Sequence, residues 1–204
     1  MKNYLQLDGM VYKLVPIKTT ITKDASQHDM GCIDSDVMYD LVKKWDWGNG
    51  DSPKIYHDPE TRRNSISYRT NMSRLMEQLI NEGKTGKAKK IIDLALTKMP
   101  LDYYGYYTMA EPFASGYYKL GEKTKARELL ERLMTKYKQS LTYYSNIEPS
   151  IQNGIASDII TDIERYRSLL MVMKDRGDMA FYNKNKPVFN SFVQRFSRFG
   201  RDLE

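Results

Sequence analysis

The sequence contains little cysteine and little histidine. Its 204 residues include one cysteine, Cys32, so no intrachain disulfide can form. The two histidines, His28 and His57, each precede an aspartate, but no third ligand follows at a spacing typical of a metal site. No motif supplies a nucleophile and base around Cys32. We therefore expect no metal, no cofactor and no catalytic residue in this chain.

Long uncharged stretches are also missing. The most apolar stretch, residues 99–118, is interrupted by Asp102, Glu111 and Pro112, and residues 1–18 lack the pattern of a secretory signal. We therefore expect no transmembrane segment. The net charge is +6, with charges of both signs interspersed along the chain, which disfavours nucleic acid as a partner.

What the sequence does contain is a repeated pattern within residues 65–138. In the first copy Gly83 stands five residues before Ala88, and in the second Gly121 stands five residues before Ala126. The two copies are 38 residues apart. Glycine permits a sharp turn between two helices, and alanine lets them approach closely. A repeat of this length predicts stacked helical hairpins.

The pattern resembles the tetratricopeptide repeat. Both copies lack the tryptophan of that repeat, and only the first has its final proline, Pro100. An ordinary helical hairpin is the alternative interpretation. We predict a mainly α fold of tetratricopeptide-like antiparallel helical hairpins, an α-solenoid, that carries a small N-terminal α/β appendage. The predicted domains are residues 1–60 for the appendage and residues 61–204 for the helical part.

The appendage combines a hairpin with a short helix. Residues 2–18 predict two strands around Asp8 and Gly9, and residues 55–64 predict an extended connector. Asp34 or Ser35 is expected to cap a helix from Asp36 to about Trp45. An isolated hairpin is marginally stable, so we expect its apolar residues to dock on the helices: Leu5, Leu7, Val11 and Leu14.

The last part of the chain predicts a third helical hairpin. Residues 155–176 have helical spacing and end at Gly177, and residues 179–199 form a second helix that Pro187 is expected to kink or split. We interpret this hairpin as the terminal cap of the repeats.

Clustered tyrosines are the strongest binding signal in the sequence. A tyrosine offers an apolar ring and a hydroxyl, which suit contact with a peptide or a glycan. Packing of these rings between helices is the competing interpretation, and the sequence slightly favours it. The residues expected to bind a partner are Tyr103, Tyr104, Tyr106, Tyr107 and Tyr117, with Arg69 and Arg74 at the rim.

A more specific resemblance extends over nearly the whole chain. It rests on the segments LQLDGMVYKLVPIK, DSDVMYDLVKKWDWGN, RRNSISYRTNMSRLMEQLINEGK and AEPFASGYYKLGE. These resemble the soluble C-terminal region of an uncharacterised bacterial family of multi-spanning membrane proteins, which are themselves similar to protein O-mannosyltransferases. The resemblance implies a soluble domain of a membrane protein, on the periplasmic side, with the cytoplasmic side left open. Any catalytic site would belong to the membrane portion.

Together these patterns predict a function without catalysis. We expect an interaction or accessory domain of a membrane glycosyltransferase-like protein, which binds a peptide, a glycan or a protein on a helical-repeat surface. The alternative is a purely structural module that packs against its own membrane portion.

Overall fold

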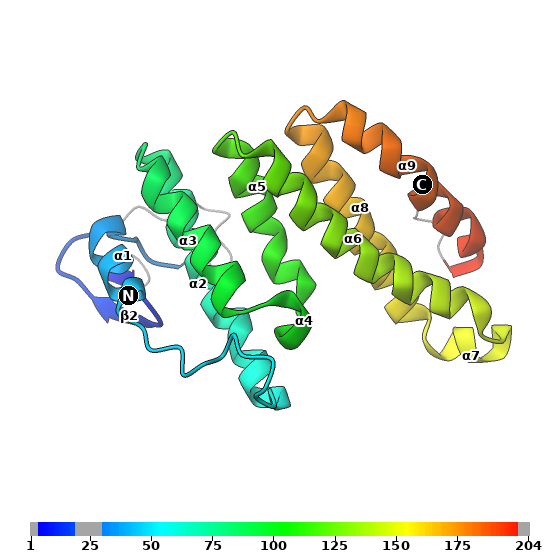
Figure 1. Cartoon of the computed structure of the whole chain (residues 1–204), viewed down its shortest axis with the longest axis horizontal. Coiled ribbons are helices and arrows are strands. Elements are labelled where there is room, and N and C mark those ends of the chain that lie inside the picture. Colours follow the sequence, from blue (N-terminus) through cyan, green and yellow to red (C-terminus); the bar gives the residue numbers. More distant parts are fainter. Residues whose placement is uncertain (1–3, 19–29, 200–204) are drawn as a thin grey trace. The chain divides into compact units, whose positions relative to one another are not determined.

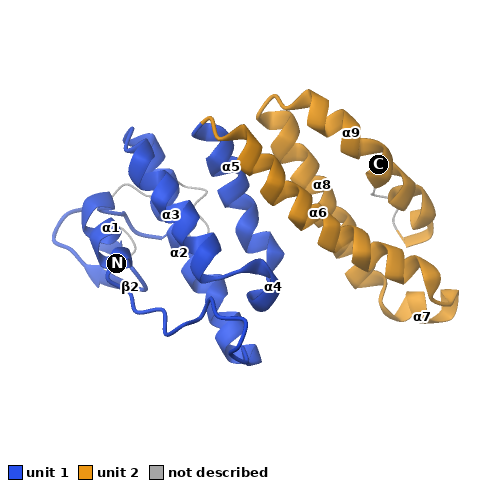
Figure 2. Ribbon diagram, viewed as in Figure 1, with its two compact units in different colours: residues 1–120 blue, residues 121–204 orange. Residues whose placement is uncertain are grey.

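The computed structural model describes residues 4–18 and 30–199 and divides the chain into two compact units (Figure 2). The first unit is Met1–Leu120 and the second is Gly121–Glu204. The described residues are mainly helical, with a small antiparallel sheet in the first unit. The division between the units follows Leu120, and the predicted domain boundary at residue 60 stays a prediction.

The sheet is the predicted hairpin. Strand β1, Leu5–Asp8, pairs with β2, Val11–Leu14, and Asp8 lies opposite Val11, so Gly9 and Met10 form the turn. Cys32 bonds to the other edge of β1, with its carbonyl oxygen 2.8 Å from the amide nitrogen of Leu7. Strand β1 is therefore central and β2 is an exposed edge. Leu7 is buried as expected, but the expectation was wrong for Val11 and Leu14, which face solvent.

Helix α1, Ser35–Lys43, begins as the sequence predicts. The Asp34 carboxylate caps it by accepting hydrogen bonds from the amides of Asp36 and Val37 at 3.2 and 3.1 Å. Its buried face includes Met38 and Val42.

Helix α2, Pro59–Asn81, begins earlier than predicted. The Asp58 carboxylate accepts hydrogen bonds from the amides of Glu60 and Thr61 at 2.9 and 3.0 Å, and proline suits the first helical position because it has no amide to satisfy. The prediction of an extended connector was therefore wrong for residues 59–64, whereas residues 55–58 lie outside the helix. An aspartate directly before a proline is itself a helix-start signal.

Helix α2 organises the first unit. It packs against α1, α3 (Thr85–Lys98), α4 (Leu101–Tyr104), α5 (Glu111–Lys119) and the 3-10 helix η3 (Tyr107–Ala110) (Figure 1). Gly83 has a left-handed φ of 74° and turns the chain between α2 and α3. Ala88 of α3 is fully buried, as its place in the pattern predicts.

The appendage belongs to the first unit because α2 holds it directly. The Asn71 amide donates to the carbonyl oxygen of Gly9 at 2.9 Å. The Arg74 guanidinium donates to the Tyr12 hydroxyl at 2.8 Å and to the carbonyl oxygen of Met30 at 2.9 Å. These bonds connect α2 to both sides of the hairpin region, so the hairpin lies within the first compact unit.

The second unit contains α6 (Lys123–Asn146), α7 (Pro149–Gly154), α8 (Ala156–Asp175), α9 (Met179–Arg195) and the 3-10 helix η4 (Ser197–Phe199). Helix α8 packs against both α6 and α9. Helix α9 continues through Pro187, so this proline does not split the helix, and the alternative expectation of a kink stays a prediction. Ala126 of α6 is fully buried, as expected.

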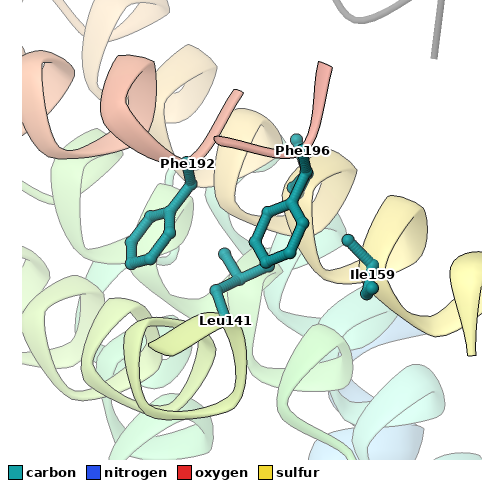
Figure 3. Packing of buried hydrophobic residues seen from close by; sticks show 5 residues of the cluster. Leu141, Ile159, Phe192 and Phe196 are labelled. Carbon is teal, nitrogen blue, oxygen red and sulfur yellow. The ribbon is translucent and has the colours of Figure 1, made fainter. Parts of the chain in front are cut away.

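Two features hold the second unit together. A buried cluster joins its three long helices, and Figure 3 shows the Phe196 ring between Phe192 and Ile159, with Leu141 of α6 next to it. The carboxylate of Asp178, between α8 and α9, is only 1% exposed and accepts two hydrogen bonds at 2.7 Å from Arg127 of α6. This bidentate pair satisfies a carboxylate that burial would otherwise destabilise.

Gly116 provides a test of packing in the first unit. A Cβ at this position of α5 would overlap the Met76 sulfur and stand 3.1 Å from Ile92 Cδ1. We predict that Gly116→Ala lowers the free energy of unfolding by about 1–2 kcal/mol, because overpacking outweighs the gain in helix propensity.

Gly86→Ala is the matched control, because a Cβ at this position in α3 would have no atom of the described residues within 4 Å apart from its chain neighbours and the backbone of its own helix. It should raise stability by about 0.5–1 kcal/mol. Urea denaturation measures both changes. Equal stabilisation by the two substitutions would show that α5 does not approach α2 and α3 this closely.

Candidate functional site

A pocket of about 190 Å³ lies on the first unit. Its walls come from the connector that follows α1, from the first turns of α2, and from the residues at the end of α3 and in α4. Both tryptophans of the chain line it. The lining residues are Trp45, Asp46, Trp47, Thr61, Asn64, Ser65, Tyr68, Met99 and Tyr104.

Three aromatic rings in mutual contact form one side of the pocket. The Trp45 ring meets the Tyr68 ring edge-to-face at 5.1 Å between centroids, with 89° between the planes. Trp47 lies 5.6 Å from Trp45 and 5.8 Å from Tyr68. All three residues are half-buried, so the cluster is supported from below and still reaches solvent. Such edge-to-face arrangements are favoured by the ring quadrupoles.

The Trp45 ring is fixed in part by the β-hairpin. A Cβ at Gly9 would stand 3.1 Å from Trp45 Cζ2, so the indole packs directly on the backbone of the turn. The same turn is held to α2 by the hydrogen bond from Asn71. The appendage thus helps to position this wall of the pocket.

Tyr104 forms another wall and is supported by an aromatic contact. Its ring lies 4.9 Å from the His57 ring, and its hydroxyl sits so close to Gly50 that a Cβ there would be 2.5 Å away. His57 Nε2 donates to the carbonyl oxygen of Gly50 at 2.7 Å, because a carbonyl can only accept. Burial raises the pKa of the Tyr104 hydroxyl, so this group is neutral at physiological pH.

Arg69 holds the segment that carries Tyr104. It is fully buried, and its guanidinium donates to the carbonyl oxygens of Met99 at 2.8 Å, Gly105 at 2.6 Å and Tyr106 at 3.3 Å. These three carbonyls flank α4 on both sides. The side chain therefore replaces the hydrogen bonds that this irregular segment would otherwise make with water.

Arg69 carries its charge without a carboxylate in these contacts. Burial lowers its pKa to about 10, so it is still protonated at neutral pH. Its Nε is buried and has no hydrogen-bond partner among the residues that the structure describes. The positive charge is thus balanced by carbonyl dipoles, just behind the wall that Met99 and Tyr104 form.

Asp46 is the only charged residue among those that line the pocket. It is exposed, and one carboxylate oxygen accepts a hydrogen bond from the amide of Gly48 at 3.0 Å. Of the hydroxyl groups that line the pocket, that of Thr61 donates to the Asp58 carboxylate and that of Ser65 to the carbonyl oxygen of Arg62.

The tyrosines expected to bind a partner do not form one surface. Tyr104 and Tyr117 are buried, and the Tyr117 hydroxyl donates to the Asp93 carboxylate at 2.6 Å. Tyr103 is half-buried and stacks on His57 at 5.6 Å. Tyr107 is half-buried in η3, and Tyr106, 41% exposed, is the most accessible of the five. Of this set, only Tyr104 lines the pocket.

The two arginines expected at the rim are structural. Arg69 is completely buried, so its placement at a rim was wrong, and the physical reason is its bonds to the carbonyls around α4. Arg74 is half-buried and holds the hairpin region through Tyr12 and Met30. A buried arginine without an acidic partner has no distinctive sequence pattern.

The sequence interpretation missed Trp45, Trp47 and Tyr68. The segment WDWGNGDSP was interpreted only as a break in regular structure because of its turn-forming residues. A signal was nonetheless present, since the only two tryptophans of the chain flank one aspartate. Large aromatic residues are seldom placed in a turn-rich connector unless they are packed or bind something.

The described part of the chain has no group of three or more histidine, cysteine, aspartate or glutamate side chains arranged to hold a metal ion. His28 lies outside the described residues, and His57 is engaged with Gly50 and two tyrosine rings. Within residues 4–18 and 30–199, each helix is too short or too polar to cross a lipid bilayer.

A scan against protein-family models, a search of curated proteins and a search of solved structures each found no match to this chain. The family resemblance seen in the sequence therefore stays a prediction.

The role of Arg69 gives a direct test. We predict that Arg69→Met lowers the free energy of unfolding by about 3 kcal/mol or more, because the carbonyl oxygens of Met99 and Gly105 lose the side-chain donor that holds them, while that of Tyr106 keeps only the amide of Met109. The control is Arg63→Met, which removes the same charge from an exposed position of α2 and should change stability by less than about 0.5 kcal/mol. Chemical denaturation measures both. Similar small losses in the two variants would contradict the role assigned to Arg69.

Proposed function

We propose that this chain is a non-catalytic binding module that holds part of an extended partner, a peptide or a glycan, in the pocket formed by Trp45, Trp47 and Tyr68. The observation that carries the proposal is that both tryptophans of the chain lie half-buried around one open pocket. Exposed aromatic clusters of this kind are enriched at binding sites, where their rings supply contact area at low entropic cost.

The size of the pocket favours an extended partner. Pockets for drug-sized ligands measure about 300–1,000 Å³, whereas this one measures about 190 Å³. It accommodates one ring or one side chain, and the rest of the ligand would lie across the surface. This fits a polymer better than a compact metabolite.

The polar groups of the pocket support binding without chemistry. Its single lining carboxylate, Asp46, is exposed and engaged by the amide of Gly48. The lining residues include no histidine, cysteine or lysine to pair with it as a base or nucleophile.

We further propose that the helical hairpins belong to a tetratricopeptide-like series. Gly83, Gly121 and Gly177 all have left-handed φ angles near 70–76° at the turns that join successive helices. Ala88 and Ala126, five residues after the first two of these glycines, are fully buried. A helical-repeat scaffold would present the aromatic pocket as part of an interaction surface.

The second resemblance supports a proposal about context. It would make this chain an accessory domain of a membrane glycosyltransferase-like protein, on the periplasmic side. In that context, the pocket would hold a partner near the membrane enzyme. The rival proposal is a purely structural module that packs against its own membrane portion and binds no free ligand.

Intrinsic fluorescence tests the proposed site, because all tryptophan emission comes from two residues that line the pocket. Titration with panels of peptides and oligosaccharides should shift the tryptophan emission for at least one ligand class. For that ligand, Tyr68→Ala should weaken binding by roughly tenfold, the loss of about 1.4 kcal/mol expected for one aromatic contact.

Tyr106→Ala is the matched control, because Tyr106 is exposed and does not line the pocket. It should leave the affinity unchanged. If Tyr106→Ala weakens binding while Tyr68→Ala does not, the partner binds the tyrosine-rich linker instead. If no ligand of either class alters the emission, the structural-module proposal takes the place of this one.

A further inference from the structure

The shape of the aromatic corner restricts what can enter it. The planes of Trp45, Trp47 and Tyr68 are inclined to one another by 50–89°, so the rings form a corner and not a flat platform. A small ring that presents both a face and an edge fits such a corner. Aromatic-lined grooves of this kind are how several domain classes bind proline-rich segments, whose polyproline II conformation is already formed before binding.

The hydrogen-bonding groups of the corner match a chain of carbonyl acceptors. An indole N–H is a donor only, and the side chains of Tyr68 and Asn64 add a hydroxyl and an amide that can donate. Proline residues have a carbonyl oxygen and no amide N–H, so a proline-rich backbone offers acceptors alone. The Thr61 and Ser65 hydroxyls donate to Asp58 and Arg62 but can still accept hydrogen bonds, so the shape of the corner, more than its hydrogen-bonding groups, favours a proline-rich chain over a glycan.

The inner end of the pocket and its mouth differ in the sign of the nearest charge. Behind Met99 and Tyr104 lies the buried guanidinium of Arg69, which disfavours a cation deep in the pocket. At the mouth, the exposed carboxylate of Asp46 favours one. The charges of Asp58 and Glu60 at the start of α2 offset those of Arg62 and Arg63, which follow in the next turn. A ligand that places a neutral ring inside the pocket, near Arg69, and a basic group at the mouth, near Asp46, suits both charges.

We propose that the pocket binds a proline-rich segment of a partner protein in the polyproline II conformation, with a proline in the corner of Trp45, Trp47 and Tyr68 and a lysine or arginine beside Asp46. This inference rests on the proposed function and names the ligand class of the same site.

The experiment measures tryptophan emission during titration with four ligands. They are a lysine-flanked hexaproline, a glutamate-flanked hexaproline, a lysine-flanked peptide of equal length in which glycine and serine replace proline, and maltohexaose. The lysine-flanked hexaproline should bind best. Its preference over the glutamate-flanked peptide should be roughly two- to fivefold at low salt, the range of an exposed ion pair, and should shrink as salt is added.

Two charge-removing variants test the role of Asp46. Asp46→Asn keeps an oxygen that accepts the hydrogen bond from Gly48, so the local turn is retained while the charge is lost. This substitution should abolish the preference for the lysine-flanked over the glutamate-flanked hexaproline, while both peptides still bind. Asp40→Asn removes the same charge from an exposed position of α1 that does not line the pocket, and the preference should persist.

Each other result overturns the inference in a recognisable way. A response to maltohexaose without a response to either hexaproline leaves the proposed function standing and replaces the ligand class by a glycan. Equal binding of the glycine-serine and hexaproline peptides makes the site a cation site without a proline pocket. If none of the four ligands alters the emission, and wider peptide and oligosaccharide panels also fail, both the inference and the proposed function are wrong.

Discussion

The first unit depends on one buried arginine that bonds to backbone. Arg69 extends from the middle of α2 and donates to carbonyl oxygens on both sides of α4. The segment between α3 and α5 is short of regular structure, and its carbonyls would be costly to bury without donors. By supplying those donors, Arg69 fixes Tyr104 against His57 and Gly50 and so builds one wall of the aromatic pocket.

Helix α2 also holds the opposite wall. Asn71 and Arg74 bind the hairpin and the segment next to β1, and the turn of that hairpin supports Trp45. Tyr68, from the same helix, contacts both tryptophans. A single long helix thus contacts both segments that complete the pocket, residues 45–47 and residues 99–104, and burial of its apolar face against α3 and α5 provides the stability that these irregular segments lack.

Local signals made much of the fold predictable. The aspartate cap of α1, the helix ends at Gly83 and Gly177 and the buried Ala88 and Ala126 all follow from short-range chemistry that a sequence displays. The signal for the start of α2, Asp58 followed by Pro59, is equally local. It was overlooked when residues 55–64 were interpreted as an extended connector. Pro187 broke no helix, because tertiary packing of α9 outweighs the loss of one hydrogen bond.

The site depended on long-range contacts, and it was predicted less well. Tyrosine density pointed to the segment around α4, yet most of those rings pack inward or stack on their neighbours. Whether a ring faces the core or a pocket is decided by what the chain brings from elsewhere, here the tryptophans of the connector after α1. The burial of Arg69 could not be predicted for the same reason, because its hydrogen-bond partners are 30 to 37 residues away in the sequence.

The central claim is that this pocket is where a partner binds. A two-dimensional ¹H–¹⁵N spectrum of the whole chain, recorded with and without a saturating ligand, tests it most directly. The account predicts that the largest shifts appear at the indole N–H signals of Trp45 and Trp47 and at the amides of Asp46, Tyr68 and Tyr104. Largest shifts in residues of the second unit, with both indole signals unmoved, would contradict it.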